Sequence, residues 1–320
     1  MAILITGGTG FLGSYLARHL LDLGEGPIVL FDILINRENI ADLGDNVTVV
    51  QGDQSEAVEV LEVVRQYDVT EIVHLGYAIG ELTSQPERAI QVNVNGTNEI
   101  FQIARILGVR RVVWASSGAA YGYHPTIPAE AEPLREDAPM RPLSLYGACK
   151  LFNEHVAEDY ARRFGLDHIG FRFTSIYGLG RSSRRLIGRD FYSRLVEHAV
   201  AGEPYTTPLA DQLFNWTYVE DVARAIHTAL RAPKPKVRIF NVSGDTRSVA
   251  ESVEFDRSEL VPGAPVEIGT QRERRIPILT NDLIRAELGW EPKFSMEEGM
   301  RDYVARLRGR QPAPVPRREG

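Results

Sequence analysis

The feature that most constrains the fold is a glycine-rich loop placed directly after an apolar run at the start of the chain. The run covers residues 2–6, and Gly7, Gly10 and Gly13 follow it in a G-x-x-G-x-x-G pattern before leucines recur at helical spacing. Glycine is required where a turn needs positive φ, where a phosphate approaches bare backbone, and where a helix packs closely on a strand. The strand–loop–helix unit therefore predicts a dinucleotide site with its pyrophosphate at the helix N-terminus. The loop residues expected there are Gly7, Gly10, Phe11, Leu12 and Gly13.

Short apolar strands alternate with helices through the first half of the chain. The long helices are expected at residues 89–107 and 145–164. Strands separated by helices of this length require parallel crossovers, which predicts an α/β fold with a doubly wound, Rossmann-type parallel sheet. The strands are expected at residues 2–6, 28–31, 47–50, 71–75, 111–115 and 168–173.

Proline interrupts the chain repeatedly after about residue 175, where the regular alternation ends. We therefore expect a dinucleotide-binding domain over residues 1–175 and a smaller, irregular substrate lobe over residues 176–308. An exposed tail rich in proline and arginine is expected over residues 309–320. Some segments of the second part are expected to return to the first domain.

Composition narrows the class of protein further. The 320 residues carry a net charge of −7, which argues against nucleic acid as a partner. No apolar run approaches the roughly 18 residues that span a membrane, and the first residues lack the basic lead-in of a signal peptide. One cysteine, Cys149, excludes a disulfide framework, and the seven histidines show no metal-ligand spacing. We expect a cytoplasmic, enzyme-sized protein without a metal.

Two acidic residues follow the strands next to the glycine loop. Asp32 closes the second strand, 19 residues after Gly13, where a carboxylate binds the adenosine ribose hydroxyls. A 2′-phosphate about 4 Å from this carboxylate would cost up to roughly 4 kcal/mol at an effective dielectric near 20, so NAD is favoured over NADP. Asp53 follows the third strand, where it is either a partner for the adenine amino group or a helix cap.

Tyr146 and Lys150 lie four residues apart in a predicted helix, so their side chains share one helical face. A free tyrosine has a pKa near 10, and a cation about 4 Å away lowers that pKa by about three units at moderate dielectric. The pair therefore predicts a general base that removes a proton from an alcohol. Lysine is rare in this chain, so the presence of a lysine at position 150 is more informative than it would be in an average protein. The four lysines are Lys150, Lys234, Lys236 and Lys293.

Several further motifs give the chain a family resemblance. They are HLGYA at 74–78, NVNGT at 93–97, ASSGAAYG at 115–122, the stretch 172–178, WTYVEDVA at 216–223 and LGWEP at 288–292. With them the chain resembles the extended short-chain dehydrogenase/reductase family over about residues 1–300. Within that family it is similar to the NAD-dependent epimerases and dehydratases, such as UDP-glucose 4-epimerases. The stretch 141–147, with Ser175 behind it, is also similar to uronate dehydrogenases.

The resemblance implies a role for each matching residue. Tyr146 would be the base, and Lys150 would hold the nicotinamide ribose and lower the pKa of Tyr146. Ser117 would hydrogen-bond the reacting oxygen, and Ser116 takes its place if the register is off by one. The remaining cofactor contacts expected are Gln54, Leu75, Gly76, Ala78 and Asn93.

The chain departs from the family pattern around the substrate. Gly118 and Ala119 stand where dehydratases carry acidic residues, so no side chain there can protonate a leaving hydroxyl and elimination is disfavoured. Ser175 and Phe214 stand where nucleotide-sugar enzymes usually have an asparagine and an arginine for the diphosphate. Arginines after the sixth strand are candidate substitutes, and they are equally expected on a solvated face. The substrate contacts expected are Ser116, Ser117, Ser175, Arg184, Arg185 and Phe214.

These residues leave three functional hypotheses open. The first is an NAD-dependent epimerase that oxidises a secondary alcohol of a sugar-type substrate, with a nucleotide sugar favoured. The second is a net dehydrogenase of a free sugar acid or another small hydroxy compound, and the third is a non-catalytic NAD-binding protein. The apolar surface of the helices at 89–107 and 145–164 also predicts a homodimer through a four-helix contact, as the resemblance implies.

Overall fold

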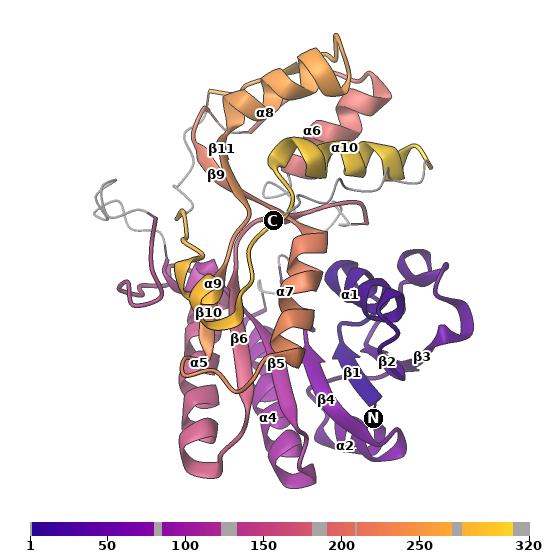
Figure 1. Ribbon diagram of the computed structural model, residues 1–320, viewed down its shortest axis with the longest axis vertical. Helices are drawn as coiled ribbons and strands as arrows, with labels where there is room; N and C mark the ends of the chain where they lie inside the picture. The colour runs from indigo at the N-terminus through magenta and orange to yellow at the C-terminus, as the bar shows by residue number, and fades with distance from the viewer. Residues whose placement is uncertain are drawn as a thin grey trace.

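The computed structural model of the chain describes residues 2–79, 85–122, 133–180, 191–208, 210–270 and 277–309. A sheet with helices on both faces makes up its larger part (Figure 1). No helix within these ranges is long and apolar enough to cross a membrane. A smaller lobe lies at one end of the sheet, at the top of Figure 1, and contains the helices α6 (Phe191–Ala201), α8 (Val249–Phe255) and α10 (Met296–Leu307).

The central sheet has seven strands in the order β10-β6-β5-β4-β1-β2-β3, and every neighbouring pair is parallel. The strand order reverses at β1, which lies between β2 and β4, and such a reversal leaves a crevice at the carboxyl ends of the strands. The predicted doubly wound fold is confirmed. The strands are β1 (Ala2–Thr6), β2 (Ile28–Asp32), β3 (Val47–Gln51), β4 (Val69–His74), β5 (Arg111–Ser117), β6 (His168–Phe173) and β10 (Ile239–Val242).

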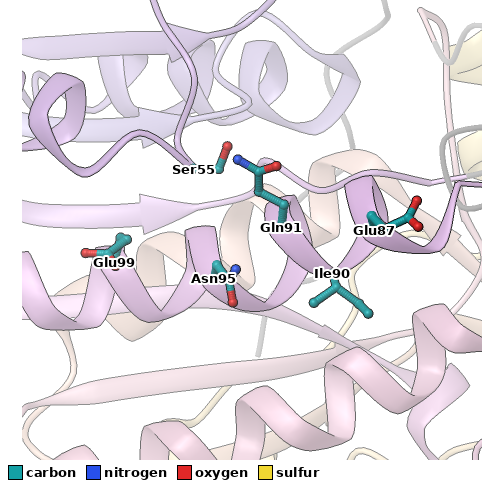
Figure 2. Close-up of a pocket in the computed structure, with 6 residues that line it drawn as sticks. All are labelled: Ser55, Glu87, Ile90, Gln91, Asn95 and Glu99. Carbon is teal, nitrogen blue, oxygen red and sulfur yellow. The ribbon is translucent and has the colours of Figure 1, made fainter.

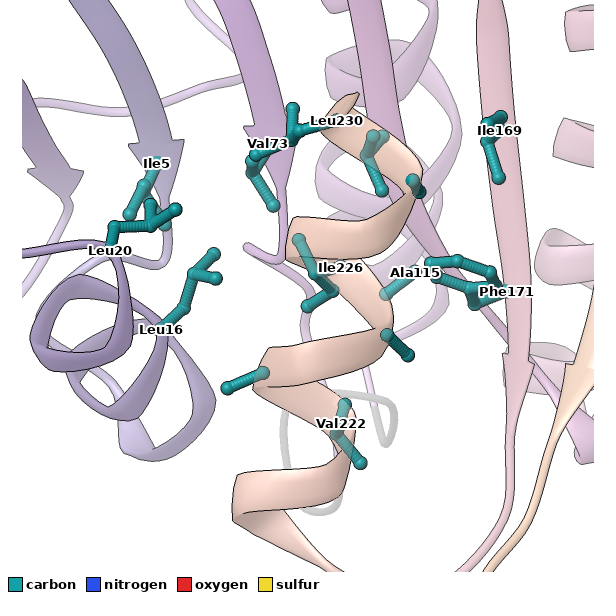
Figure 3. Close-up of a cluster of buried hydrophobic side chains, with 14 of the residues drawn as sticks. Ile5, Leu16, Leu20, Val73, Ala115, Ile169, Phe171, Val222, Ile226 and Leu230 are labelled. Atoms are coloured by element: carbon teal, nitrogen blue, oxygen red, sulfur yellow. The ribbon is translucent and has the colours of Figure 1, made fainter. Parts of the chain in front are cut away.

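Helices cover both faces of this sheet. α1 (Phe11–Asp22) and α7 (Val219–Arg231) pack on one face, and α2 (Ala57–Gln66), α4 (Gly96–Leu107) and α5 (Leu145–Phe164) pack on the other. Because α7 has apolar residues every four positions, they form a stripe that faces the strands (Figure 3). The residues of this stripe, all without exposed surface, are Val222, Ile226 and Leu230.

The two long predicted helices both exist, and one of them is interrupted. The helix expected at 89–107 consists of α3 (Pro86–Ile90), a π-helical segment (Gln91–Asn95) and α4. α5 begins where predicted because the Ser144 hydroxyl accepts a hydrogen bond from Gly147 N at 3.1 Å. It ends at Gly165, whose left-handed conformation suits glycine.

The smaller lobe begins where β6 ends. β7 (Ile176–Tyr177) follows β6 almost directly, so the lobe lies at the carboxyl ends of the central strands. The chain then returns to the central sheet as β10, beyond residue 175, while the predicted domain boundaries themselves stay predictions. The lobe sheet has the order β11-β9-β7. The remaining elements are β8 (Tyr205–Thr206), β9 (Leu213–Tyr218), β11 (Asp245–Ser248), β12 (Val266–Glu267) and α9 (Asp282–Leu288).

Candidate active site

The glycine loop forms a tight cradle between β1 and α1. Gly7 has a φ of 65°, and a Cβ added to it would lie 2.9 Å from Gly76 N. A Cβ added to Gly13 would meet the carbonyl oxygen of Gly7 and lie 2.7 Å from the Cα of Gly8. Side chains are therefore excluded where a pyrophosphate would approach the N-terminus of α1 at Phe11. The residues present fit the NAD that the sequence predicts.

Asp32 is anchored to this loop at the end of β2. Its Oδ2 accepts hydrogen bonds from the backbone N–H of Thr9 at 3.1 Å and from the Thr9 hydroxyl at 2.9 Å. Oδ1 has a longer contact, 3.5 Å from the N–H of Leu34. The loop therefore fixes the carboxylate at the carboxyl edge of the sheet, with Oδ1 the less engaged oxygen. The ribose contact of Asp32 stays a prediction.

Asp53 already has donors on both carboxylate oxygens. Oδ1 accepts from the Ser55 N–H at 2.9 Å and the Ser55 hydroxyl at 2.7 Å, and Oδ2 pairs with Arg88 at 2.6 Å. Burial alone would raise the pKa of Asp53, but Arg88 and Ser55 outweigh it and lower that pKa. An adenine amino group would have to share these oxygens, so neither role expected for Asp53 is decided.

A pocket opens beside these acidic residues on the side of β2 and β3. Its lining includes Phe31 and Ile33, the sequence neighbours of Asp32, together with Asp53. The side chains around it combine apolar walls with carboxylates. They include Phe31, Ile33, Val50, Asp53, Glu59 and Glu62.

Gln54 and Asn93 hold the backbone of the stretch that follows β4. Gln54 Nε2 donates to the carbonyl oxygen of Gly76 at 2.6 Å. The carboxamide of Asn93, within the π-helical segment, accepts from Ala78 N at 2.7 Å and donates to Ala78 O at 3.0 Å. Both amides, predicted as direct cofactor contacts, thus position the wall of the cleft that Leu75, Gly76 and Ala78 are expected to form.

Lys150 is a buried cation at the carboxyl edge of the sheet. Its side chain has no exposed surface, and its Nζ donates a hydrogen bond of 2.5 Å to the carbonyl oxygen of Ala115 on β5. Nζ lies 5.3 Å from the ring centroid of Tyr146. Burial lowers the pKa of Lys150 well below its ordinary value. The predicted pair is therefore together, with the ammonium out of water.

The two serines at the end of β5 point to opposite faces of the sheet. The Ser116 hydroxyl donates to Glu154 Oε1 at 2.5 Å and has almost no exposed surface. The Ser117 hydroxyl accepts from Ala119 N at 3.1 Å, at the turn where the strand ends. Ser116 is thus engaged with α5, and Ser117 with the turn that follows the strand; the role expected for either serine at the reacting oxygen stays a prediction.

A buried ionic network lies under the site, and sequence reasoning gave it no role. Arg172 on β6 forms a two-bond contact with Glu154 on α5, at 2.9 and 2.8 Å. Arg172 also donates to the Tyr121 hydroxyl at 2.6 Å, and that hydroxyl donates to Asn241 Oδ1 at 2.7 Å. These bonds tie α5 to β6 and β10 and so fix the helix that carries Tyr146. Arg172 and Tyr121 both lie in motifs that carried the resemblance.

Beyond the two serines on β5, the structure describes two of the predicted substrate residues, Ser175 and Phe214. Ser175 is half-buried between β6 and β7. Phe214 on β9 has no exposed surface and packs on Phe191 and Tyr192, with ring centroids 5.2 and 5.8 Å apart, so the structure gives its predicted substrate contact no support. Arg184 and Arg185 lie outside the described residues. Among the described residues, no cluster of three or more histidine, cysteine or acidic side chains could hold a metal ion.

Comparison with known proteins gives one family. The model of the NAD dependent epimerase/dehydratase family matches residues 3–243. A UDP-glucose 4-epimerase of Streptomyces lividans is 30% identical over 308 residues, which cover 90% of this chain and 91% of the relative. The solved UDP-glucose 4-epimerase of Thermotoga maritima with UDP-glucose is 25% identical, with a TM-score of 0.84 over 97% of this chain and 99% of that one. A GalE-like L-threonine dehydrogenase from Cupriavidus necator is also 25% identical, with a TM-score of 0.83 over 96% of this chain and 100% of that one.

The chain belongs to the NAD-dependent epimerase/dehydratase family. It is therefore an enzyme of the extended short-chain dehydrogenase/reductase type, and its cofactor is NAD. The predictions of family, enzyme class and cofactor are confirmed. The reaction and the substrate remain to be inferred from the site.

Proposed function

We propose that the protein is an epimerase that oxidises and re-reduces a secondary alcohol of a nucleotide sugar. The observation that carries this proposal is the buried ammonium of Lys150, held 5.3 Å from the ring of Tyr146 at the carboxyl edge of the sheet. The glycine cradle between β1 and α1 opens at the same edge. A base and a dinucleotide site on one edge are what alcohol oxidation by hydride transfer needs.

In this proposal each side chain has one task. Tyr146 takes the proton from the substrate hydroxyl, and the Lys150 cation favours the phenolate form of Tyr146. The Ser117 hydroxyl donates a hydrogen bond to the same substrate oxygen. The glycine cradle would hold NAD, which would supply a reversible hydride acceptor for the carbon, with inversion when the hydride returns to the opposite face. The network of Arg172 and Glu154 keeps α5 in register with the sheet, so that Tyr146 stays in reach of the reacting oxygen.

The substrate class rests on the relatives and on two small residues. The matching enzymes from Streptomyces lividans and Thermotoga maritima act on UDP-glucose. Gly118 and Ala119 follow Ser117 without a side chain that could protonate a leaving hydroxyl, which argues against a dehydratase.

A dehydrogenase of a free sugar acid or another small hydroxy compound is the second candidate. Ser175 and the fully buried Phe214 replace the asparagine and arginine expected for a nucleotide diphosphate. The similarity to a GalE-like L-threonine dehydrogenase supports this candidate as well. A non-catalytic NAD-binding protein is disfavoured by the presence of Ser117, Tyr146 and Lys150 together.

We further propose a cytoplasmic homodimer that packs through α4 and α5. Large apolar side chains on these helices and on α3 are exposed by 42–55%, which is costly on a surface left in water. They are Ile90, Ile106, Phe152 and Phe164. A pocket beside Ile90 combines this side chain with polar groups (Figure 2). Its other lining residues are Ser55, Glu87, Gln91, Asn95 and Glu99. Light scattering at micromolar concentration should give twice the 35.7 kDa chain mass, and a monomer mass would refute the dimer.

The nucleotide that the purified protein carries separates the two candidate reactions. We would denature the protein and identify the released nucleotide by chromatography. An epimerase keeps its cofactor through the cycle, so near-stoichiometric NAD supports the proposal. Protein that releases none and binds NAD reversibly would favour the dehydrogenase, and a screen of sugar acids at about 340 nm, where reduced nicotinamide absorbs, would follow.

A further inference from the structure

The ring of Tyr77 lies against the Lys150 ammonium. Tyr77 follows β4 in the stretch that forms the expected wall of the cofactor cleft, and its ring centroid is 2.6 Å from Lys150 Nζ. The ring of Tyr146 is farther from the same nitrogen, at 5.3 Å. On its other side the Tyr77 ring packs on His74, with ring centroids 4.7 Å apart. The face of Tyr77 is therefore the nearer of the two aromatic surfaces to the buried cation.

The Lys150 ammonium needs such a contact because it is withdrawn from water. Its hydrogen bond to Ala115 O satisfies one of its three N–H groups. Glu154, one turn along α5, directs both carboxylate oxygens to Arg172 and one of them also to Ser116. An aromatic face attracts a cation through its quadrupole, and the attraction grows when the cation is desolvated. Tyr77 supplies that attraction at short range.

Glu154 also favours the charged form of Lys150, and Tyr77 is the side chain whose ring face lies directly against the ammonium. Burial, with a smaller contribution from the Lys150 charge, lowers the pKa of His74 to about 3, so His74 is neutral at working pH. Burial raises the pKa of the Cys149 thiol, which is likewise neutral. Among the described residues, the titratable groups around Lys150 are His74 on β4, Tyr77 after it, Tyr146, Cys149 and Glu154 on α5, and Arg172 on β6.

We propose that Tyr77 is a positioning residue that holds the Lys150 ammonium beside Tyr146 through the face of its ring. This inference rests on the proposed function, in which a charged Lys150 favours the phenolate of Tyr146. It assigns a task to an aromatic side chain in the wall of the cofactor cleft. Because the contact uses the ring face, phenylalanine should replace Tyr77 and an aliphatic residue should not.

The test measures the charge of Lys150 directly and needs no substrate. The chain has four lysines, so lysine labelled with ¹³C at Cε gives four resonances, and the variant Lys150→Met identifies that of Lys150. We would titrate the wild type, Tyr77→Phe and Tyr77→Leu by NMR, with Lys234, Lys236 and Lys293 as internal standards. Tyr77→Leu loses the cation–π contact with the desolvated ammonium, so the pKa of Lys150 should be lower in this variant by at least about one unit. Tyr77→Phe should titrate with the wild type.

Two results would overturn the inference. The first is the same Lys150 titration in all three proteins, and the second is an equal shift in Tyr77→Phe and Tyr77→Leu. If Tyr77→Leu fails to fold, Tyr77→Met keeps a side chain of similar length and the same comparison applies. A failure of the proposed function can be distinguished from a failure of this inference. It would appear as unchanged turnover in Tyr146→Phe, whatever the result of the Lys150 titration.

Discussion

Asp256 is a buried carboxyl group whose ionisation should cost the protein stability. It lies in the π-helical segment Asp256–Leu260 of the smaller lobe and has no exposed surface, and within the part of the chain that the structure describes neither of its carboxylate oxygens has a hydrogen-bond partner. Burial raises the pKa of Asp256 from 3.8 to about 7. The folded protein therefore keeps the proton to a higher pH than the unfolded chain does.

The sign and the size of the effect follow from this difference. Well below pH 3.8 both states are protonated and Asp256 costs no stability. As the pH rises the unfolded chain releases its proton first, so the free energy of unfolding falls until the folded group also ionises near pH 7. Each pKa unit corresponds to about 1.4 kcal/mol, so the full cost at pH 8 is roughly 4 kcal/mol, of which about 3 kcal/mol accrues above pH 5.

Urea unfolding at pH 5 and pH 8 tests this reasoning with Asp256→Asn. The amide cannot ionise, so the variant should gain about 3 kcal/mol on the wild type between the two pH values. Asp45→Asn, which replaces an exposed carboxylate, serves as the matched control and should show no such gain. A difference between Asp256→Asn and the wild type that is the same at both pH values would refute the reasoning.

Three further predictions concern the cofactor and the assembly. Gly13→Ala should weaken NAD binding at least about tenfold, as measured by calorimetry, because the added Cβ would meet the carbonyl oxygen of Gly7. An unchanged affinity would contradict the proposal that the glycine loop binds the pyrophosphate. Asp32→Ala should raise the affinity for NADP relative to that for NAD by at least about tenfold, because the variant lacks the carboxylate expected to repel the 2′-phosphate. An unchanged ratio of the two affinities would show that Asp32 does not contact the ribose. Phe152→Glu should yield a monomer in light scattering, because it places a charge on the apolar face of α5, and a persistent dimer would place the interface elsewhere.

The sequence predicts six of the seven strands of the central sheet because each is a short apolar run bounded by turn residues; β10 (Ile239–Val242), which returns to the sheet from the irregular part of the chain, was not predicted as a strand. Periodicity cannot show the π-helical segment Gln91–Asn95, since its residues continue a helical pattern. The sequence leaves Ser116 as the alternative to Ser117, because a shift of one residue in a strand reverses the face to which the side chain points. Asn93 lies in a family motif, but its hydrogen bonds to Ala78 depend on packing between distant segments.

Contacts between residues that are distant in sequence could not be predicted for a different reason. Phe214 stands where the resemblance expects an arginine, and only tertiary packing reveals that its ring joins Phe191 and Tyr192 in a core. Tyr77 was visible in its motif, yet its contact with Lys150 arises between residues 73 positions apart. Residues far apart in sequence meet here without any periodic signal.

The most direct test of the central claim is the conversion of UDP-glucose by the wild type and by Tyr146→Phe, followed by NMR of the sugar. We expect the wild type to form UDP-galactose without net reduction of NAD, and Tyr146→Phe to bind NAD but form no product. Equal turnover by the two proteins would contradict the role of Tyr146. A wild type that leaves UDP-glucose unchanged and reduces NAD with a free sugar acid would contradict the proposed epimerase.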